Sequence, residues 1–143
     1  MLLNFQRRFV AKIRRKETRH TIRAKRARRP RVGEICHCYT GLRQKGARLL
    51  GRWPCVKVQD IEIHWYPGFW IVIDGEKLSR DECEALARSD GFKTFIDMMR
   101  FWEDRLPFSG YIIHWDPTRP AKFPRRPRRA SRAEHRPEGV NPK

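Results

Sequence analysis

Basic side chains form the most chemically informative group in this sequence. Between Arg7 and Arg31 there are 13 Lys and Arg residues against one acid, Glu17. A run that repels itself this strongly needs a polyanion or full solvation as its counter-charge. Phosphate suits these side chains, because guanidinium and ammonium groups pair with it directly. Within this run we expect contacts to nucleic acid from Arg19, Arg23, Lys25, Arg26, Arg28, Arg29 and Arg31.

Two further basic segments add to this prediction. The loop from Gly41 to Gly46 carries Arg43 and Lys45, which suit phosphate, but it lacks the spacing of a P-loop and does not indicate nucleotide hydrolysis. Residues 117–143 hold nine Lys and Arg, two acids and six of the ten prolines. This composition predicts a disordered basic Pro/Arg-rich tail, because it offers too few apolar residues to bury. In the tail we expect phosphate contacts from Arg125, Arg126, Arg128 and Arg129.

The charge is unevenly distributed along the chain. Of the formal net charge of +17, almost none comes from residues 33–116, which hold 11 bases and 13 acids. A chain of 143 residues fits one domain, which we place at residues 1–116. No window approaches the ~20 apolar residues of a transmembrane helix, and the start lacks the apolar run of a secretory signal. We therefore expect a cytoplasmic protein without a membrane partner.

Four cysteines, Cys36, Cys38, Cys55 and Cys83, raise the question of zinc. Structural zinc sites use closely spaced pairs such as C-x2-C, and no such pair is present. We expect Cys55 to precede a strand and Cys83 to lie in a helix, so the four thiols would not converge. The sequence favours buried, reduced cysteines that pack as small apolar residues, with no metal and no cofactor.

Histidines and aromatics allow two interpretations each. His64 and His114 each precede a Trp on an expected strand, so they face solvent if the tryptophans fill the core, or form an acid–base pair for RNA cleavage. Some aromatics are candidates for stacking on an unpaired base, the alternative being core packing. They are Tyr39, Trp53, Tyr66 and Trp70.

The spacing of apolar residues along the chain predicts the short helices and strands that carry the candidate site residues. A helix over 6–15, with Asn4 as its cap, puts Phe5, Phe9 and Ile13 on one stripe. Alternation of side chains then predicts strands at 34–40 and 56–65. Two further strands are expected at 20–24, which contains the β-branched pair Thr-Ile, and at 70–73, which ends at Asp74-Gly75.

After Gly75 the period changes to that of helices. Ser79 and Glu82 form a capping box that opens a helix ending near Arg88. A second helix is marked by Phe92, Phe95, Ile96, Met99 and Trp102, with Asp90 as its expected N-cap, and a last strand covers 111–115. This order predicts the α+β class. We expect a small, strongly bent β-barrel of five to six strands with two to three helices at its openings.

Four segments carry a resemblance to a known family. They are NFQRRFVAKIRRKETRHTIRAKR near the start, RRPRVGEICHCYTGLR, SDGFKTFIDMMRFW and the closing PFSGYIIHW. Together they cover residues 2–115, and the chain resembles the ASCH domain of the PUA-like superfamily, especially its small phage and prophage forms. The resemblance implies a PUA-like barrel and a role connected with RNA.

Some members of such families are hydrolases, removing the acetyl group of N4-acetylcytidine or cleaving RNA. Their strand-entry motif has the form G-x-K-x-x-E-x-R, with Thr in place of the acid in the amidohydrolase branch. Aligned on it, Thr21 takes the Thr position and Arg23 the Arg position, but Lys16 stands where Gly is expected and Thr18 where Lys is. Asp90 resembles in position the acid of that branch. The resemblance thus implies Thr21, Lys16 and Asp90 as catalytic residues, with Lys25 as an alternative base.

We therefore expect a monomer that binds RNA or a nucleotide in a basic cleft lined by Thr21, Arg23 and the cluster from Lys25 to Arg31, with DNA as the alternative polyanion. One competing function is hydrolysis of N4-acetylcytidine-like nucleosides or of RNA. The other is that of a phage-encoded interaction protein whose basic surface engages a host protein complex.

Overall fold

The computed structural model describes residues 1–119, which contain three helices and seven strands. The predicted α+β class is confirmed. In chain order the elements are β1 (Leu2–Phe5), α1 (Arg7–Arg14), β2 (His20–Ala24), β3 (Ile35–Thr40), β4 (Arg48–His64), β5 (Trp70–Ile73), β6 (Glu76–Lys77), α2 (Arg80–Ser89), α3 (Phe95–Trp102) and β7 (Phe108–Trp115). Within this part of the chain, no helix combines the length and apolar character needed to cross a membrane.

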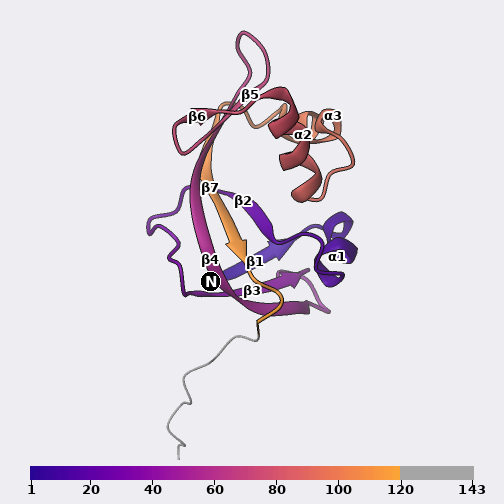
Figure 1. The fold of residues 1–143 in the computed structure, drawn as a ribbon. Coiled ribbons are helices and arrows are strands. Elements are labelled where there is room, and N and C mark those ends of the chain that lie inside the picture. Colours follow the sequence, from indigo (N-terminus) through magenta and orange to yellow (C-terminus); the bar gives the residue numbers. More distant parts are fainter. Residues whose placement is uncertain (120–143) are drawn as a thin grey trace, which may run out of the picture.

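The long strand β4 and its partner β7 run through the whole molecule and connect its two ends (Figure 1). β4 pairs with β3 over its first part and with β7 and β5 over its second part. β1 lies parallel to β3, and β2 is antiparallel to β7. The described strands form a sheet whose path ends at β1 and β6, so their pairing leaves the sheet open and shows no closed barrel.

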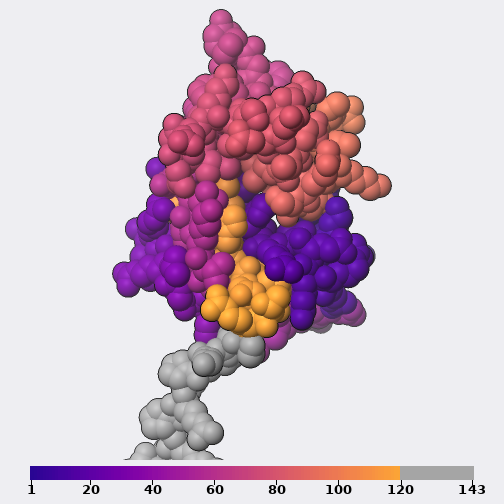
Figure 2. Space-filling view, viewed as in Figure 1, coloured from indigo at the N-terminus to yellow at the C-terminus, as the bar shows by residue number. Residues whose placement is uncertain are grey.

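Two halves lie at opposite ends of these long strands. Residues 1–54, here called the basic half, comprise β1, α1, β2, β3 and the start of β4. Residues 65–107, here called the helical half, comprise β5, β6, α2 and α3. The space-filling view shows the indigo N-terminal segment meeting the salmon helical segment (Figure 2).

Each half has its own cluster of buried apolar residues. Because successive side chains of a strand point to opposite faces, the shared strands contribute residues to both clusters. On β7, Ile112 packs among the residues under α2 and α3, whereas its neighbour Ile113 packs with the β1–β3 residues. All four cysteines are buried, and Cys36, Cys38 and Cys55 belong to the second cluster. The prediction that the cysteines are buried core residues is therefore confirmed.

One predicted helix cap is correct, whereas two other predictions about where elements begin are wrong. The Ser79–Glu82 capping box opens α2 as predicted. The prediction that Asn4 caps α1 is wrong, because Asn4 lies in β1 and its Oδ1 accepts a hydrogen bond from the Leu42 amide at 3.1 Å. Cys55 does not precede a strand either, since β4 begins at Arg48 and continues through Pro54 with a bulge just after Cys55.

Candidate functional site

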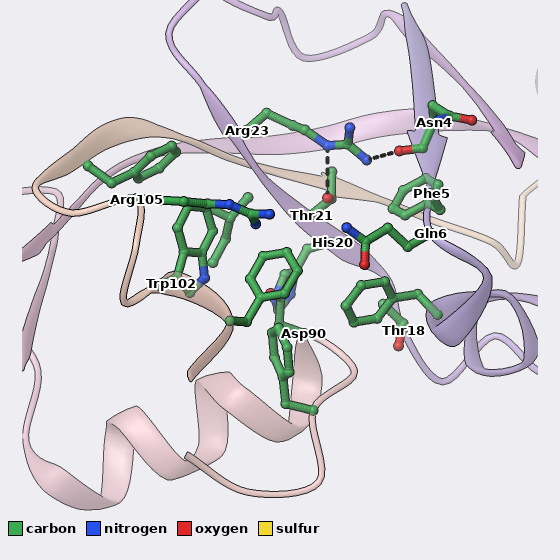
Figure 3. Close-up of a pocket in the computed structure, with 15 residues that line it drawn as sticks. Asn4, Phe5, Gln6, Thr18, His20, Thr21, Arg23, Asp90, Trp102 and Arg105 are labelled. Atoms are coloured by element: carbon green, nitrogen blue, oxygen red, sulfur yellow. Dashed lines mark hydrogen bonds and ion pairs between the residues drawn. The ribbon is translucent and has the colours of Figure 1, made fainter. Parts of the chain in front are cut away.

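A pocket of about 330 Å³ lies where the two halves meet (Figure 3). This volume falls at the lower end of the range of small-ligand sites, ~300–1,000 Å³. The basic half and the helical half both contribute lining residues, and β7 contributes one. They are Asn4, Phe5, Gln6, Phe9, Thr18, His20, Thr21, Ile22 and Arg23 from the first, Asp90, Phe92, Phe101, Trp102 and Arg105 from the second, and Phe108 from β7.

The edge strand β2 is central to the pocket. Its only strand partner among the described residues is β7, so its other edge is not covered by a strand. Neighbouring residues of a strand point to opposite faces, which places His20 and Ile22 on one side and Thr21 and Arg23 on the other. Because the pocket follows the edge of β2, it receives all four side chains.

Arg23 is held in place by three contacts from the basic half. Its Nε donates to Thr21 Oγ1 at 3.1 Å, one terminal nitrogen donates to the Asn4 carbonyl at 2.6 Å, and the guanidinium lies 4.8 Å from the centre of the Phe5 ring. Burial lowers the pKa of Arg23 below its ordinary value, and the charge of Arg26 acts in the same direction. A half-buried guanidinium fixed in this way is suited to bind an anionic or acceptor group.

Asp90 faces the other side of β2. Its side chain is 11% exposed, and Oδ1 lies 3.2 Å from His20 Nε2, within ion-pair distance. Burial raises the pKa of Asp90, while His20 and Arg23 partly oppose that shift. The prediction that Asp90 caps the following helix is wrong, because Asp90 is the C-cap residue of α2 and Thr94 caps α3.

The turn after Asp90 explains this position. Gly91 has φ +99°, and a Cβ there would lie 2.9 Å from the Phe9 ring, so both backbone and space require glycine. Lys12 Nζ donates to the Gly91 carbonyl at 3.2 Å, which ties the turn to α1.

The helical half adds two hydrogen-bond donors to the pocket. Trp102 is 5% exposed, and its buried indole Nε1 has no hydrogen-bond partner among the described residues. In Figure 3 this nitrogen turns toward the side chains that line the pocket. The guanidinium of Arg105 stacks 4.3 Å from the centre of the Phe101 ring.

A second histidine continues the polar contacts behind His20. The His20 and His114 rings lie 5.2 Å apart between centres, and His114 Nε2 lies 2.7 Å from Gln59 Oε1. Gln59 Nε2 donates to Asp74 Oδ2 at 3.3 Å, so its Oε1 is oriented toward His114, and a neutral His114 carries its proton on Nε2. Burial lowers the pKa of His114 to about 4.

The predicted His64/His114 pair is therefore wrong. In the β4–β7 register Lys57 is opposite His114 and Ile63 opposite Phe108, so His64 lies seven residues further along β4. The ring of His64 stacks on Trp70 instead, with centres 4.1 Å apart.

Of the predicted site residues, Thr21, Arg23 and Asp90 come together in the pocket. Lys16 does not line it: this residue follows the end of α1 in the left-handed conformation, φ +62°, and is exposed. That conformation favours glycine, the residue expected there from the family motif. Thr18, at the Lys position of the motif, is buried in the pocket wall.

The remaining predicted cations lie outside the pocket. Arg28 pairs with Glu34 at 2.9 Å and Arg29 with Asp60 at 2.7 Å. The others occupy the surface of the basic half, namely Arg19, Lys25, Arg26, Arg31, Arg43 and Lys45. Arg125, Arg126, Arg128 and Arg129 lie outside the described residues.

The sequence analysis missed His20, Trp102 and Arg105 as site residues. His20 is adjacent to Thr21 in the motif, so its position was available, but its partner Asp90 is 70 residues away in sequence. Trp102 and Arg105 looked like the end of an amphipathic helix. The stacking candidates Tyr39, Trp53, Tyr66 and Trp70 are absent from the pocket lining, which uses phenylalanines instead.

No family model, no curated protein and no solved structure matches this chain. Any conclusion about function therefore depends on the chemistry of the pocket. Its aromatic walls accept a planar group, its two guanidiniums and one indole N–H suit acceptors or an anion, and Asp90 suits a donor.

Proposed function

We propose that this protein binds RNA by taking one unpaired nucleotide, or a free nucleotide, into the pocket between its halves. Phe5, Phe9, Phe92 and Phe101 give the pocket walls that stack on or enclose a base. Arg23 and Arg105 supply positive charge for a phosphate or a base carbonyl. Single-stranded RNA is read in this way, by stacking and by hydrogen bonds to unpaired base edges.

The observation that carries the proposal is the indole N–H of Trp102, which has no hydrogen-bond partner within residues 1–119. Buried donors are almost always paired, because leaving one unsatisfied costs about 1–3 kcal/mol. Trp102 lines the pocket, but its Nε1 is itself inaccessible to water, so a ligand acceptor satisfies this donor only if the indole ring shifts toward the pocket. A base carbonyl oxygen is planar, fits between aromatic walls and offers such an acceptor.

The surrounding charge supports an anionic ligand. The basic half carries 17 Lys and Arg against the acids Glu17 and Glu34. A field of this sign raises the local concentration of nucleic acid and speeds its association. The family proposal agrees with this function: we retain the ASCH resemblance, and the PUA-like barrel it implies, as a proposal.

Calorimetric titration with the four ribonucleoside monophosphates tests the pocket. Trp102→Phe keeps an aromatic ring but removes the donor, and should weaken binding of at least one nucleotide by about 0.5–1.5 kcal/mol. Trp65→Phe is the matched control, because Trp65 is 59% exposed and outside the pocket. Arg23→Ala should cost about 1–3 kcal/mol, and Thr21→Ala much less, because bonds to charged groups are the stronger ones.

Wild-type protein that binds no nucleotide in this assay would refute the pocket proposal. Equal affinities of Trp102→Phe and Trp65→Phe would show that the indole donor has no role. Thermal melts of each variant separate a loss of binding from a loss of folding.

Hydrolysis of an N4-acylated cytidine is a second candidate, favoured by one observation. The buried His20–Asp90 pair lies beside Thr21, and such a pair is a source of acid–base chemistry. Against it, no lysine lines the pocket, and Thr21 Oγ1 already accepts a hydrogen bond from Arg23. Chromatographic detection of cytidine released from N4-acetylcytidine, lost in Thr21→Ala and Asp90→Asn, would promote the hydrolase over the binder.

A further inference from the structure

One face of the sheet beside the pocket combines aromatic, polar and cationic side chains. Neighbouring strands β1, β3 and β4 point Leu3, Cys36 and Cys38 into the core. The alternate residues therefore lie on the opposite face. This face, here called the outer face, carries Leu2, Asn4, His37, Tyr39, Leu49 and Arg52.

Arg52 organises the centre of the outer face. Its Nε donates to His37 Nδ1 at 3.2 Å and a terminal nitrogen donates to the Tyr39 hydroxyl at 3.4 Å. Burial, the N-terminal ammonium and Arg52 all lower the pKa of His37, so the ring is neutral at physiological pH and its Nδ1 remains an acceptor. Two rings held by one guanidinium form a preorganised stacking surface.

The charge around the outer face has one sign. Arg43 and Lys45 are in the loop between β3 and β4, and Arg26 donates to the Leu2 carbonyl at 3.5 Å. Both acids of the basic half are occupied elsewhere, Glu17 by Arg15 and Glu34 by Arg28. Among the described residues of this half, nothing negative opposes a polyanion on the outer face.

The outer face is also continuous with the pocket. Asn4 lines the pocket and is the register partner of Tyr39 on the neighbouring strand. His37 is in turn the register partner of Arg52 on β4. Two strand spacings, roughly 10 Å, separate β1 from β4 and give room for about two nucleotides.

We propose that the outer face is the path of single-stranded RNA leaving the pocket, with bases stacking on Tyr39 and His37 and phosphates meeting Arg52 and Arg26. The occupant is single-stranded because rings offer π-faces that a duplex keeps stacked internally. The starting point of this path rests on the proposed function, since it assumes a nucleotide in the pocket.

A length series measured by fluorescence anisotropy tests the path. Labelled oligouridylates of one to six nucleotides should bind wild-type protein with affinity that rises steeply up to about three nucleotides and weakly beyond. Tyr39→Ala and Arg52→Ala should remove most of the rise, a loss of roughly fivefold or more for the trinucleotide. Neither variant should change the affinity for a mononucleotide.

Two controls make the result specific. Tyr39→Phe keeps the stacking ring and should resemble wild type. Arg100→Ala removes one positive charge from an exposed position of α3, in the helical half, and should leave the series unchanged. Melting temperatures close to wild type show that the variants fold.

A trinucleotide that binds Tyr39→Ala and Arg52→Ala as well as it binds wild type would overturn the path. If instead no mononucleotide binds while the oligonucleotides still respond to Tyr39, the pocket proposal fails and the outer face stands alone. A loss equal in Arg100→Ala and Arg52→Ala would reduce the effect to net charge and would also overturn the path.

Discussion

The basic half carries 17 Lys and Arg against two acids, whereas the helical half carries six against nine. Both halves are built on the same two strands, β4 and β7. The halves therefore differ in the charge of their side chains and not in the strands that support them. The pocket lies where these surfaces meet, with Arg23 contributed by one and Asp90 by the other. The contrast teaches that the site can present cations and a carboxylate to one ligand, which suits a nucleotide with both phosphate and base donors.

Contacts of two kinds join the halves. Arg8 of α1 pairs with Asp97 of α3 at 2.7 Å, and its guanidinium lies 5.1 Å from the ring centres of Phe9 and Phe92. The Phe92 ring packs edge-on against Phe9, with centres 5.4 Å apart, and is tilted against Phe101, with centres 5.3 Å apart. The ion pair is exposed and contributes little, so the aromatic contacts dominate the junction.

The largest expected effect comes from cutting that junction. Phe92→Ala should lower the free energy of unfolding by about 3–5 kcal/mol, because Phe92 is 1% exposed and its removal leaves a cavity. Ile96→Ala on α3, 55% exposed, should change it by less than about 0.5 kcal/mol. Urea denaturation followed by far-UV circular dichroism measures both, and equal midpoints for the two variants would show that the halves do not depend on Phe92.

A smaller effect is expected from pH at the histidine behind the pocket. The pKa of His114 is lowered by burial from 6.5 to about 4. The unfolded chain therefore takes up the proton first, so the free energy of unfolding is fully retained above about pH 6.5 and declines as pH falls toward 4. Because the ring is partly exposed, screening reduces the loss to roughly 1 kcal/mol.

His114→Gln isolates this contribution, since Gln can still donate to Gln59 but does not ionise. Asp90 acts with the opposite sign: burial raises its pKa, so its destabilising charge is neutralised as pH falls. That contribution is common to both proteins and cancels in the comparison. Thermal melts between pH 4 and 7.5 should show a flatter profile for His114→Gln, and parallel profiles would exclude the assigned shift.

The smallest expected effect concerns two groups of basic residues within the basic half, those paired with acids and those without such a pair. Arg28 and Arg29 pair with Glu34 and Asp60, whereas Arg43 and Lys45 have no acid within ion-pair distance among the described residues. Arg43→Ala with Lys45→Ala should flatten the log–log salt dependence of oligouridylate binding by about 1.4, at roughly 0.7 for each phosphate contact. Arg28→Ala with Arg29→Ala should flatten it less, because binding RNA would first break their ion pairs.

An equal slope change in both double variants would mean that the internal ion pairs do not limit phosphate binding. No slope change in the Arg43 and Lys45 variant would remove the loop from the interface. Either result would define more exactly which basic residues of the basic half contact RNA phosphates.

Local chemistry made parts of this protein predictable. The Ser79–Glu82 capping box and the strand at 20–24 follow from the residues of those short segments, and both appear in the structure. The burial of the cysteines, expected because no closely spaced pair is present, is also observed. The α+β class follows from the change of period along the chain. The concentration of cations in residues 7–31 is likewise a property of the sequence alone.

Tertiary structure alone decided what the site contains. β1 exists because it pairs with β3 more than 30 residues away, and this pairing turns Asn4 from an expected cap into a pocket wall. The β2–β7 register brings His20 beside His114, and the Gly91 turn brings Asp90 to His20. Sequence spacing carries no signal for such contacts, because they depend on which strands pair and on how α2 and α3 pack against them. Folding also separates the cations of the basic run for the same reason: Arg23 lies half-buried in the pocket, while Arg28 and Arg29 pair with acids that folding brings near.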